Sequence, residues 1–168
     1  MSMKTLLIIR HAKSSWDLTG AADIDRPLNE RGKRDAPVMA RRLIKASITI
    51  DRFVSSPARR ARQTAELFVR EFDKKEKAIR FIPELYHAAP AVFKEVVAGL
   101  DDKDDTVAIF SHNPGITAFV NMLTEVRLDN MPTCAIFAVK SSVEHWNEFL
   151  STSPEFSFFD YPKGSGID

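Results

Sequence analysis

The chain has 168 residues, 44% hydrophobic and 28% charged, a composition typical of a globular protein that builds its core without disulfides or metals. Its formal net charge of +1 excludes the strongly basic surface that general binding to nucleic acid or anionic membranes requires. Cys134 is the only cysteine, which excludes an internal disulfide and a multi-thiolate metal site and is compatible with a reducing compartment.

The predicted elements alternate between short apolar segments rich in β-branched residues and segments with helical spacing. The apolar segments predict strands over residues 6–9, 52–54, 79–82, 107–110 and 135–139. The helical spacing predicts helices over 29–44, with Asn29 as N-cap, and over 57–72, 90–100 and 114–123, each of which starts with proline. This alternation favours an α/β fold, a three-layer α/β/α sandwich with a mainly parallel sheet covered on both faces.

The remaining segments indicate loops and a short C-terminal extension. The charged runs over 71–77 and 100–106 predict solvated loops, and the chain after residue 139 predicts a loop, a short strand or turn, and a packed aromatic segment. We expect one domain over residues 1–162 and a flexible tail over 163–168. No apolar run approaches the ~18 residues of a membrane span, so we expect a cytoplasmic protein.

Polar side chains follow four of the predicted strands, at the edge of the sheet where the carboxyl ends of parallel strands meet and ligands bind. They are Arg10, His11, Lys13 and Ser14 after the first strand, Ser55, Ser56, Arg59, Arg60 and Arg62 after the second, Glu84, Tyr86 and His87 after the third, and Ser111, His112 and Asn113 after the fourth. Guanidinium groups, hydroxyls and helix N-termini together suit a tetrahedral oxyanion such as phosphate.

The candidate nucleophile in this set is His11, next to Arg10. Neutral imidazole attacks phosphorus, and the surrounding cations are expected to keep it unprotonated. The chain has neither a GxxxxGK[ST] loop nor aspartates clustered at the strand ends for two metals, so we expect chemistry without a metal or another cofactor.

Each motif also has an ordinary structural interpretation. An Arg-His pair after a strand can be structural, three arginines in one helix can form a solvated face, and "SHNPG" can be a turn that starts a helix. What favours an active site is that all of them follow strands and carry compatible charge.

Three motifs, "IIRHAKSSWD", "SSPARRARQTAE" and "IFSHNPGI", resemble the histidine phosphatase superfamily, which has a phosphoglycerate mutase-like fold. The segments "DRPLNERGKRDAP" and "FFDYPK" are most similar to the small SixA-type phosphohistidine phosphatases, which have no large cap. The resemblance implies that His11 becomes phosphorylated, that Arg10 and Arg60 bind the phosphoryl oxygens, and that His112 is the second pocket histidine. It leaves Arg59 and Arg62 on the surface.

Other positions receive weaker assignments from the same resemblance. Ser14 and Asn113 are candidates for phosphate binding, and Glu84 is the candidate acid, although it can equally be a carboxylate paired with an arginine. Ala12 replaces the glycine that usually follows Arg-His, at a position that needs little bulk. Asp17 stands where many relatives carry an asparagine, and we expect it to hold an arginine or face a cationic group of the substrate.

The sequence therefore predicts a metal-independent phosphatase with a phosphohistidine intermediate, acting on phosphohistidine of a signalling or phosphocarrier protein. The alternatives are a small-molecule phosphomonoesterase of the same superfamily and a catalytically silent domain that binds phosphorylated ligands. A mutase is disfavoured because the chain is short for a cap, and a nucleic-acid binder because no aromatic platform accompanies the arginines. We expect a monomer without nucleic-acid or membrane partners.

Overall fold

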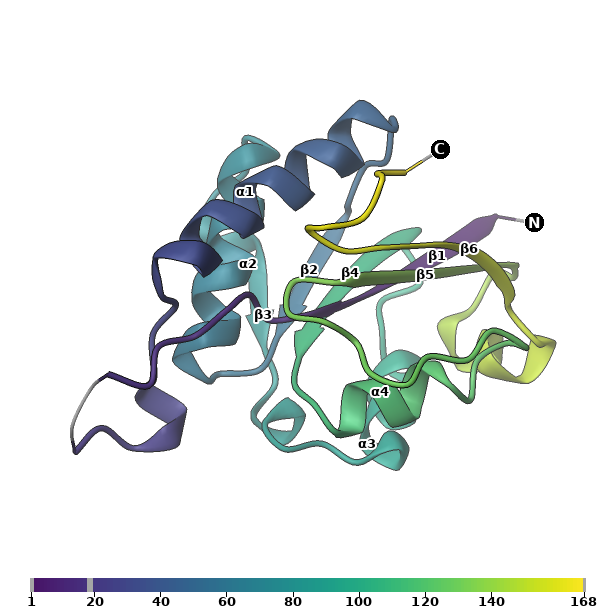
Figure 1. The fold of residues 1–168 in the computed structure, drawn as a ribbon. Coiled ribbons are helices and arrows are strands. Elements are labelled where there is room, and N and C mark those ends of the chain that lie inside the picture. Colours follow the sequence, from purple (N-terminus) through teal and green to yellow (C-terminus); the bar gives the residue numbers. More distant parts are fainter. Residues whose placement is uncertain (1, 18–19, 168) are drawn as a thin grey trace.

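A six-stranded sheet runs through the centre of the computed structural model, which describes residues 2–17 and 20–167 (Figure 1). Its strands are β1 (Met3–Arg10), β2 (Arg52–Ser55), β3 (Ile79–Phe81), β4 (Thr106–Ser111), β5 (Ile136–Ser142) and β6 (Glu155–Asp160). Their spatial order is β3-β2-β4-β1-β5-β6. The strands β3, β2, β4 and β1 pair in parallel with one another. In contrast, β5 pairs antiparallel with β1, and β6 pairs antiparallel with β5.

Helices cover both faces of the sheet, as Figure 1 shows. The helices α1 (Glu30–Lys45) and α2 (Arg59–Glu71) lie on one face, and α3 (Pro90–Ala98) and α4 (Gly115–Val120) lie on the other. Side chains of a strand point alternately to the two faces, so Leu6 and Ile8 of β1 belong to one buried cluster and Leu7 and Ile9 to the other. The predicted three-layer sandwich with a mainly parallel sheet is confirmed.

The first predicted helix agrees closely with α1. The side chain of Asn29 caps it by accepting a hydrogen bond from Gly32 N–H at 2.9 Å, and one apolar face of the helix, with Ala36, Met39 and Ala40, is buried. A side-chain acceptor at the N-cap satisfies one of the free N–H groups of the first turn.

The other helices are shorter than predicted. Because Ser56 still pairs with β4 through its N–H and Phe110 O (3.0 Å), α2 begins only at Arg59, and Pro57 precedes it. The third helix ends at Ala98 rather than residue 100, with Gly99 as its C-cap. The fourth ends at Val120, because the side chain of Asn121 holds both backbone groups of Leu128 at 2.8 Å and turns the chain away.

The C-terminal segment packs back toward α1 after β6. Arg42 Nη1 donates to Asp160 Oδ2 at 3.0 Å, and Gly166 N–H donates to Asp160 Oδ1 at 3.3 Å. Ile167 contacts the buried cluster beneath α1. The domain limit at residue 162 and the flexible tail stay predictions, and residues 1 and 168 lie outside the described part of the chain.

Four of the strands and their loops converge on one edge of the sheet. The register aligns Arg10 at the end of β1 with Ser111 at the end of β4, and Ser55 at the end of β2 with Phe110. The start of β5 reaches the same edge, where Cys134 N–H donates to the carbonyl oxygens of Arg10 and His11 at 3.1 and 3.0 Å. Across residues 2–17 and 20–167, no helix is long and apolar enough to cross a bilayer.

One close backbone approach fixes the loop before α3 against α4. A Cβ atom added at Gly115 would lie 1.7 Å from the carbonyl oxygen of Ala88 and 2.9 Å from its carbonyl carbon. Both are backbone atoms, so no side-chain rotation relieves the overlap. Only glycine fits this position without moving the chain.

Gly115→Ala is therefore expected to lower the free energy of unfolding by ~1–3 kcal/mol, the range typical of overpacking, despite the better helix propensity of alanine. The measurement is urea unfolding followed by far-UV circular dichroism. Gly99→Ala is the control, since a Cβ there would meet Glu95 O at an ordinary 3.5 Å. Equal unfolding midpoints for the two variants would contradict the packing argument.

Candidate active site

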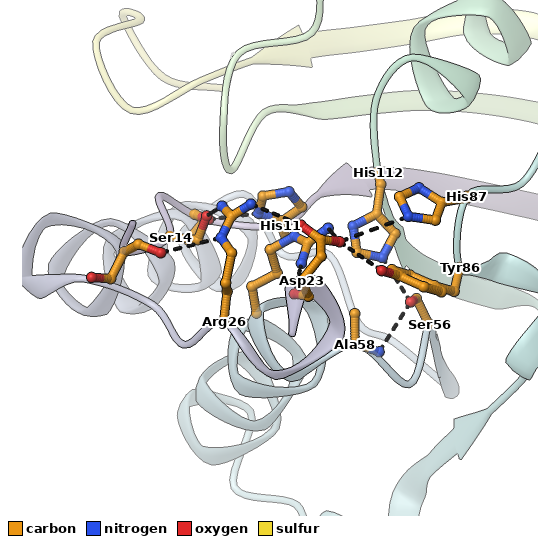
Figure 2. Close-up of polar contacts among 12 residues, drawn as sticks. His11, Ser14, Asp23, Arg26, Ser56, Ala58, Tyr86, His87 and His112 are labelled. Carbon is orange, nitrogen blue, oxygen red and sulfur yellow. Dashed lines mark hydrogen bonds and ion pairs between the residues drawn. The ribbon is translucent and has the colours of Figure 1, made fainter. Parts of the chain in front are cut away.

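A cavity of about 260 Å³ lies at the sheet edge where these strands end. It is lined by Arg10, His11, Lys13, Ser14, Trp16, Asp23, Arg26, Arg60, His87, His112, Asn113 and Thr133. The structure thus brings together six of the seven predicted site residues, which come from the end of β1 and the loop after it, the first turn of α2, and the loop after β4. Figure 2 shows the polar contacts among part of this set.

The hydrogen bonding of His11 determines which ring nitrogen can react. Its Nδ1 lies 2.7 Å from the carbonyl oxygen of Ala12, and a carbonyl oxygen only accepts, so Nδ1 carries the proton. In the neutral ring the lone pair is then on Nε2. Ala12 is fully buried, which explains why a small residue suits this position.

Burial, together with the charges of Arg60, Arg10 and Arg26, lowers the pKa of His11 to about 3. The ring is consequently neutral near pH 7, as predicted from its cationic neighbours. Cys134 is the other potential nucleophile near this edge, but it is fully buried, and burial raises the pKa of its thiol. A protonated thiol is a poor nucleophile.

Three guanidinium groups line the cavity, and two of them come from β1 and α2. Arg10 Nη1 donates to Met131 O at 2.8 Å, and its buried Nε has no hydrogen-bond partner among the described residues. Arg60 comes from the first turn of α2 and is buried. In agreement with the sequence pattern, Arg62 is exposed and Arg59 does not line the cavity.

His112 lies beside His11, with ring centroids 5.1 Å apart. Its Nε2 is 2.7 Å from Ser56 Oγ, and that oxygen accepts a hydrogen bond from Ala58 N–H at 3.2 Å. Burial, followed by the charges of His11 and Arg60, lowers the pKa of His112 to about 2. His11 and His112 are therefore both neutral at physiological pH.

Asp23 is the carboxylate at the centre of the site, and sequence reasoning missed it. Its Oδ2 accepts hydrogen bonds from Tyr86 OH at 2.6 Å and from Arg60 Nη2 at 3.1 Å, and Oδ1 accepts from Arg26 Nη1 at 2.9 Å (Figure 2). Hydrogen bonds from Tyr86 and Arg60 and the charge of Arg60 hold the pKa of Asp23 at about 2. An ionised carboxylate thus balances part of the guanidinium charge.

Arg26 connects this cluster to the mouth of the cavity. It lies over the ring of Trp16, 3.3 Å from the ring centroid, and its Nη2 contacts Ser14 Oγ. Trp16 itself is 74% exposed. Ser14 is buried and lines the cavity as predicted, with its hydroxyl already engaged by Arg26.

The structure gives different support to the weaker assignments of Glu84, Asp17 and Asn113. The structure does not bring Glu84 to the cavity: the residue is exposed in the single 3₁₀ turn Pro83–Leu85, because that turn directs it outward. Asp17 is exposed as well, and its side chain holds no arginine among the described residues. Asn113 lines the cavity, but its amide already donates to Asn130 Oδ1 and Met131 O at 2.7 and 3.2 Å.

Among the residues that line the cavity, His87 was visible in the sequence only as one of several polar residues after the third strand. Asp23 and Arg26 had a weaker signal, their place in a loop between a strand and a helix. No three His, Cys, Asp or Glu side chains in the described chain come together as a metal-binding group.

Fold and cavity together define an α/β protein with a neutral histidine in an arginine-lined cavity, and comparisons with known proteins identify its family. A family model described as histidine phosphatase superfamily (branch 1) matches residues 6–87. The uncharacterized protein ML1117 of Mycobacterium leprae (strain TN) is 32% identical over 168 residues, which cover 92% of this chain and 100% of that protein.

Two solved structures are similar over almost their whole length. SixA from Agrobacterium tumefaciens has a TM-score of 0.79 at 24% identity, with coverage of 95% of this chain and 98% of that chain. The protein histidine phosphatase SixA complexed with tungstate has a TM-score of 0.79 at 25% identity, with coverage of 94% and 97%. The chain belongs to the histidine phosphatase superfamily.

The shifted pKa values predict that His11 and His112 stay neutral in the folded protein down to about pH 4, and the hydrogen bond to Ala12 O predicts that His11 is the Nδ1–H tautomer. Ring ¹⁵N shifts recorded from pH 8 to pH 4 test both statements. The unfolded chain protonates these rings as the pH falls through 6.5, whereas the folded chain does not until about 3 and 2, so the free energy of unfolding should fall below pH 6.5. Titration of either ring near pH 6.5 would contradict this assignment.

Proposed function

We propose that this protein is a metal-independent phosphatase that transfers a phosphoryl group to Nε2 of His11 and then to water, with phosphohistidine on proteins as substrate. The observation that carries the proposal is the hydrogen bond from His11 Nδ1 to Ala12 O, because it leaves the Nε2 lone pair free in a cavity lined by Arg10 and Arg60. Superfamily membership and a SixA-like fold support a phosphatase.

In the proposed first displacement, Nε2 of His11 attacks phosphorus opposite the leaving group. Catalysis of phosphoryl transfer is mostly positioning and stabilisation of charge on the equatorial oxygens. Arg10 and Arg60 supply that charge, and His112 adds a neutral ring. The backbone oxygen and Oδ2 of Asp23 accept hydrogen bonds from two of the five N–H groups of Arg60. The other N–H groups are left for phosphoryl oxygens. Water displaces the phosphoryl group from His11 in the second step.

Two features support a protein substrate. Residues 56–105, all of them described, form α2, β3, α3 and two single 3₁₀ turns, so the chain between β2 and β4 builds no cap over the cavity. An uncovered cavity admits a histidine side chain that projects from a folded domain. The similar SixA structure is named a protein histidine phosphatase, and it binds tungstate, which is a tetrahedral oxyanion like phosphate.

Small phosphate esters are the competing substrates, since the same oxyanion pocket suits them. A phosphorelay or phosphocarrier domain phosphorylated on histidine and 4-nitrophenyl phosphate, compared at equal concentration, distinguish the two classes. We propose a higher kcat/KM for the protein substrate. A cytoplasmic monomer remains part of the proposal and rests on the sequence.

Wild-type protein mixed with a phosphohistidine protein or 4-nitrophenyl phosphate, in buffer with EDTA, is expected to gain one phosphoryl group transiently. Rapid quench into alkali and intact-mass measurement detect it, and acid treatment should remove it. His11→Ala should show neither adduct nor turnover, whereas the control His145→Ala, at an exposed histidine paired with Asp102, should behave like wild type. Absence of an adduct and of phosphate release from both donors would favour a silent phospho-ligand-binding domain.

Arg60→Lys is expected to lower kcat/KM by about 10²–10³-fold, because an ammonium group cannot reproduce the two-pronged guanidinium contact. Steady-state phosphate release measures the loss. Arg62→Lys changes an exposed arginine of the same helix and is expected to alter kcat/KM less than about twofold. Equal effects of the two substitutions would argue against a phosphoryl contact by Arg60.

A further inference from the structure

The cavity has a buried floor and an exposed rim, and these two parts face different ends of the reacting phosphoryl group. His11, Arg60 and His112 form the floor, with 6%, 4% and 3% of their surface exposed. At the rim, the side chains of His87 and Asp23 are 60% and 40% exposed. Because an in-line displacement places the leaving group opposite the nucleophile, a phosphoryl group attacked by His11 directs its leaving group toward the rim.

The leaving group needs a proton, and few side chains at the rim can supply one. Asp23 is ionised, since hydrogen bonds from Tyr86 and Arg60 hold its pKa at about 2, and a carboxylate has no proton to give. Glu84 lies outside the cavity. Lys13 lines the cavity, but its ammonium group has no hydrogen-bond or ion-pair partner among the described residues that would hold it beside the reacting centre. His87 is the remaining group, and imidazole is the side chain most often used for proton transfer.

The contacts of His87 hold its ring beside the reacting centre. Its Nε2 lies 3.7 Å from Asp23 Oδ2, at ion-pair distance, as the dashed line in Figure 2 marks. The ring packs on Tyr86 with centroids 3.9 Å apart and lies 6.3 Å from the ring of His112. Asp23 is itself fixed by Tyr86 and Arg60, so the carboxylate that faces His87 is anchored from two further elements.

The backbone of this loop is also held in an uncommon conformation. His87 has a φ of 56°, in the left-handed region that few non-glycine residues adopt and that occurs preferentially at functional sites. The carbonyl group of the next residue, Ala88, lies close to Gly115 at the start of α4. A Cβ atom at position 115 would overlap the Ala88 carbonyl oxygen. This contact holds the loop next to His112, so the packing of the fold fixes the position of His87.

We propose that His87, oriented by Asp23, is the acid–base residue of this phosphatase. The inference rests on the proposed function and adds a catalytic residue to it.

The proposed proton transfers balance in both displacements. As Nε2 of His11 forms its bond to phosphorus, the bond from phosphorus to the leaving atom breaks and its electron pair stays with the leaving group. His87 gives its proton to the leaving oxygen of an ester, or to the ring nitrogen of a phosphohistidine that is not bonded to phosphorus. In the second displacement, neutral His87 accepts a proton from the attacking water, and the P–N electron pair returns to His11.

The test compares two aryl phosphates whose leaving groups differ in their need for a proton. For His87→Asn, we expect kcat/KM for phenyl phosphate to fall about 10²–10⁴-fold, the usual contribution of general acid catalysis. For 4-nitrophenyl phosphate, whose phenolate leaves without protonation, the expected change is below about threefold because Asn also tolerates the left-handed backbone. Since kcat/KM reports only the first displacement here, decay of the phosphorylated protein in single turnover tests the base role separately, and it should slow as well.

Two matched variants complete the experiment. His145→Asn alters an exposed histidine that lies 2.9 Å from Asp102 outside the cavity, and it should leave both substrates unaffected. An equal loss of kcat/KM on both substrates in His87→Asn would overturn the inference, and so would a loss that depends on the leaving group in Glu84→Gln instead. Either result would leave the proposed phosphatase function standing. Absence of turnover and of a phosphorylated intermediate in the wild-type protein would instead overturn the proposed function, and the inference with it.

Discussion

The hydrogen bond from His11 Nδ1 to the carbonyl oxygen of Ala12 is the interaction on which the site depends, because it leaves the free lone pair of the neutral ring on Nε2. Ala12 is held in turn, since its N–H donates to Thr64 Oγ1 at 2.9 Å and that hydroxyl donates to Arg60 O at 2.7 Å. The turn of α2 that presents the Arg60 guanidinium therefore also fixes the residue that sets the His11 tautomer. Thr64 thus links the loop that carries His11 to the helix turn that carries Arg60.

Charge at this edge is balanced locally. Arg10, Arg26 and Arg60 surround a neutral histidine, and burial followed by the charge of Arg60 lowers the pKa of Arg10. Buried charges without a partner are costly, and Asp23 reduces that cost by pairing with two of the three guanidinium groups. The remaining positive potential is confined to a small cavity, so a chain with a net charge of only +1 still concentrates positive charge at one place.

The layers of the fold, the capped helix α1 and the placement of Arg10, His11, Arg60 and His112 could be predicted from the sequence. Each depends on a local signal: an alternating apolar pattern, an N-cap residue, or a position directly after a buried strand. Asp23 had no such signal. Its partner Tyr86 is 63 residues away, and the loop that carries Asp23 has neither apolar periodicity nor a strand end to place it. Contacts of this kind depend on how two loops meet, which a single sequence does not specify.

The direction of side chains in the loop after β3 shows the same limit at finer scale. Glu84 and His87 both follow a predicted strand, and sequence reasoning favoured the carboxylate, yet the 3₁₀ turn exposes Glu84 while His87 reaches the rim. The difference arises from the left-handed backbone at His87 and from the contact of Ala88 with Gly115. Gly115, the glycine of "SHNPG", therefore also positions the loop after β3. By admitting the Ala88 carbonyl it places His87 opposite His112, so one short motif locates a histidine at the floor and another at the rim.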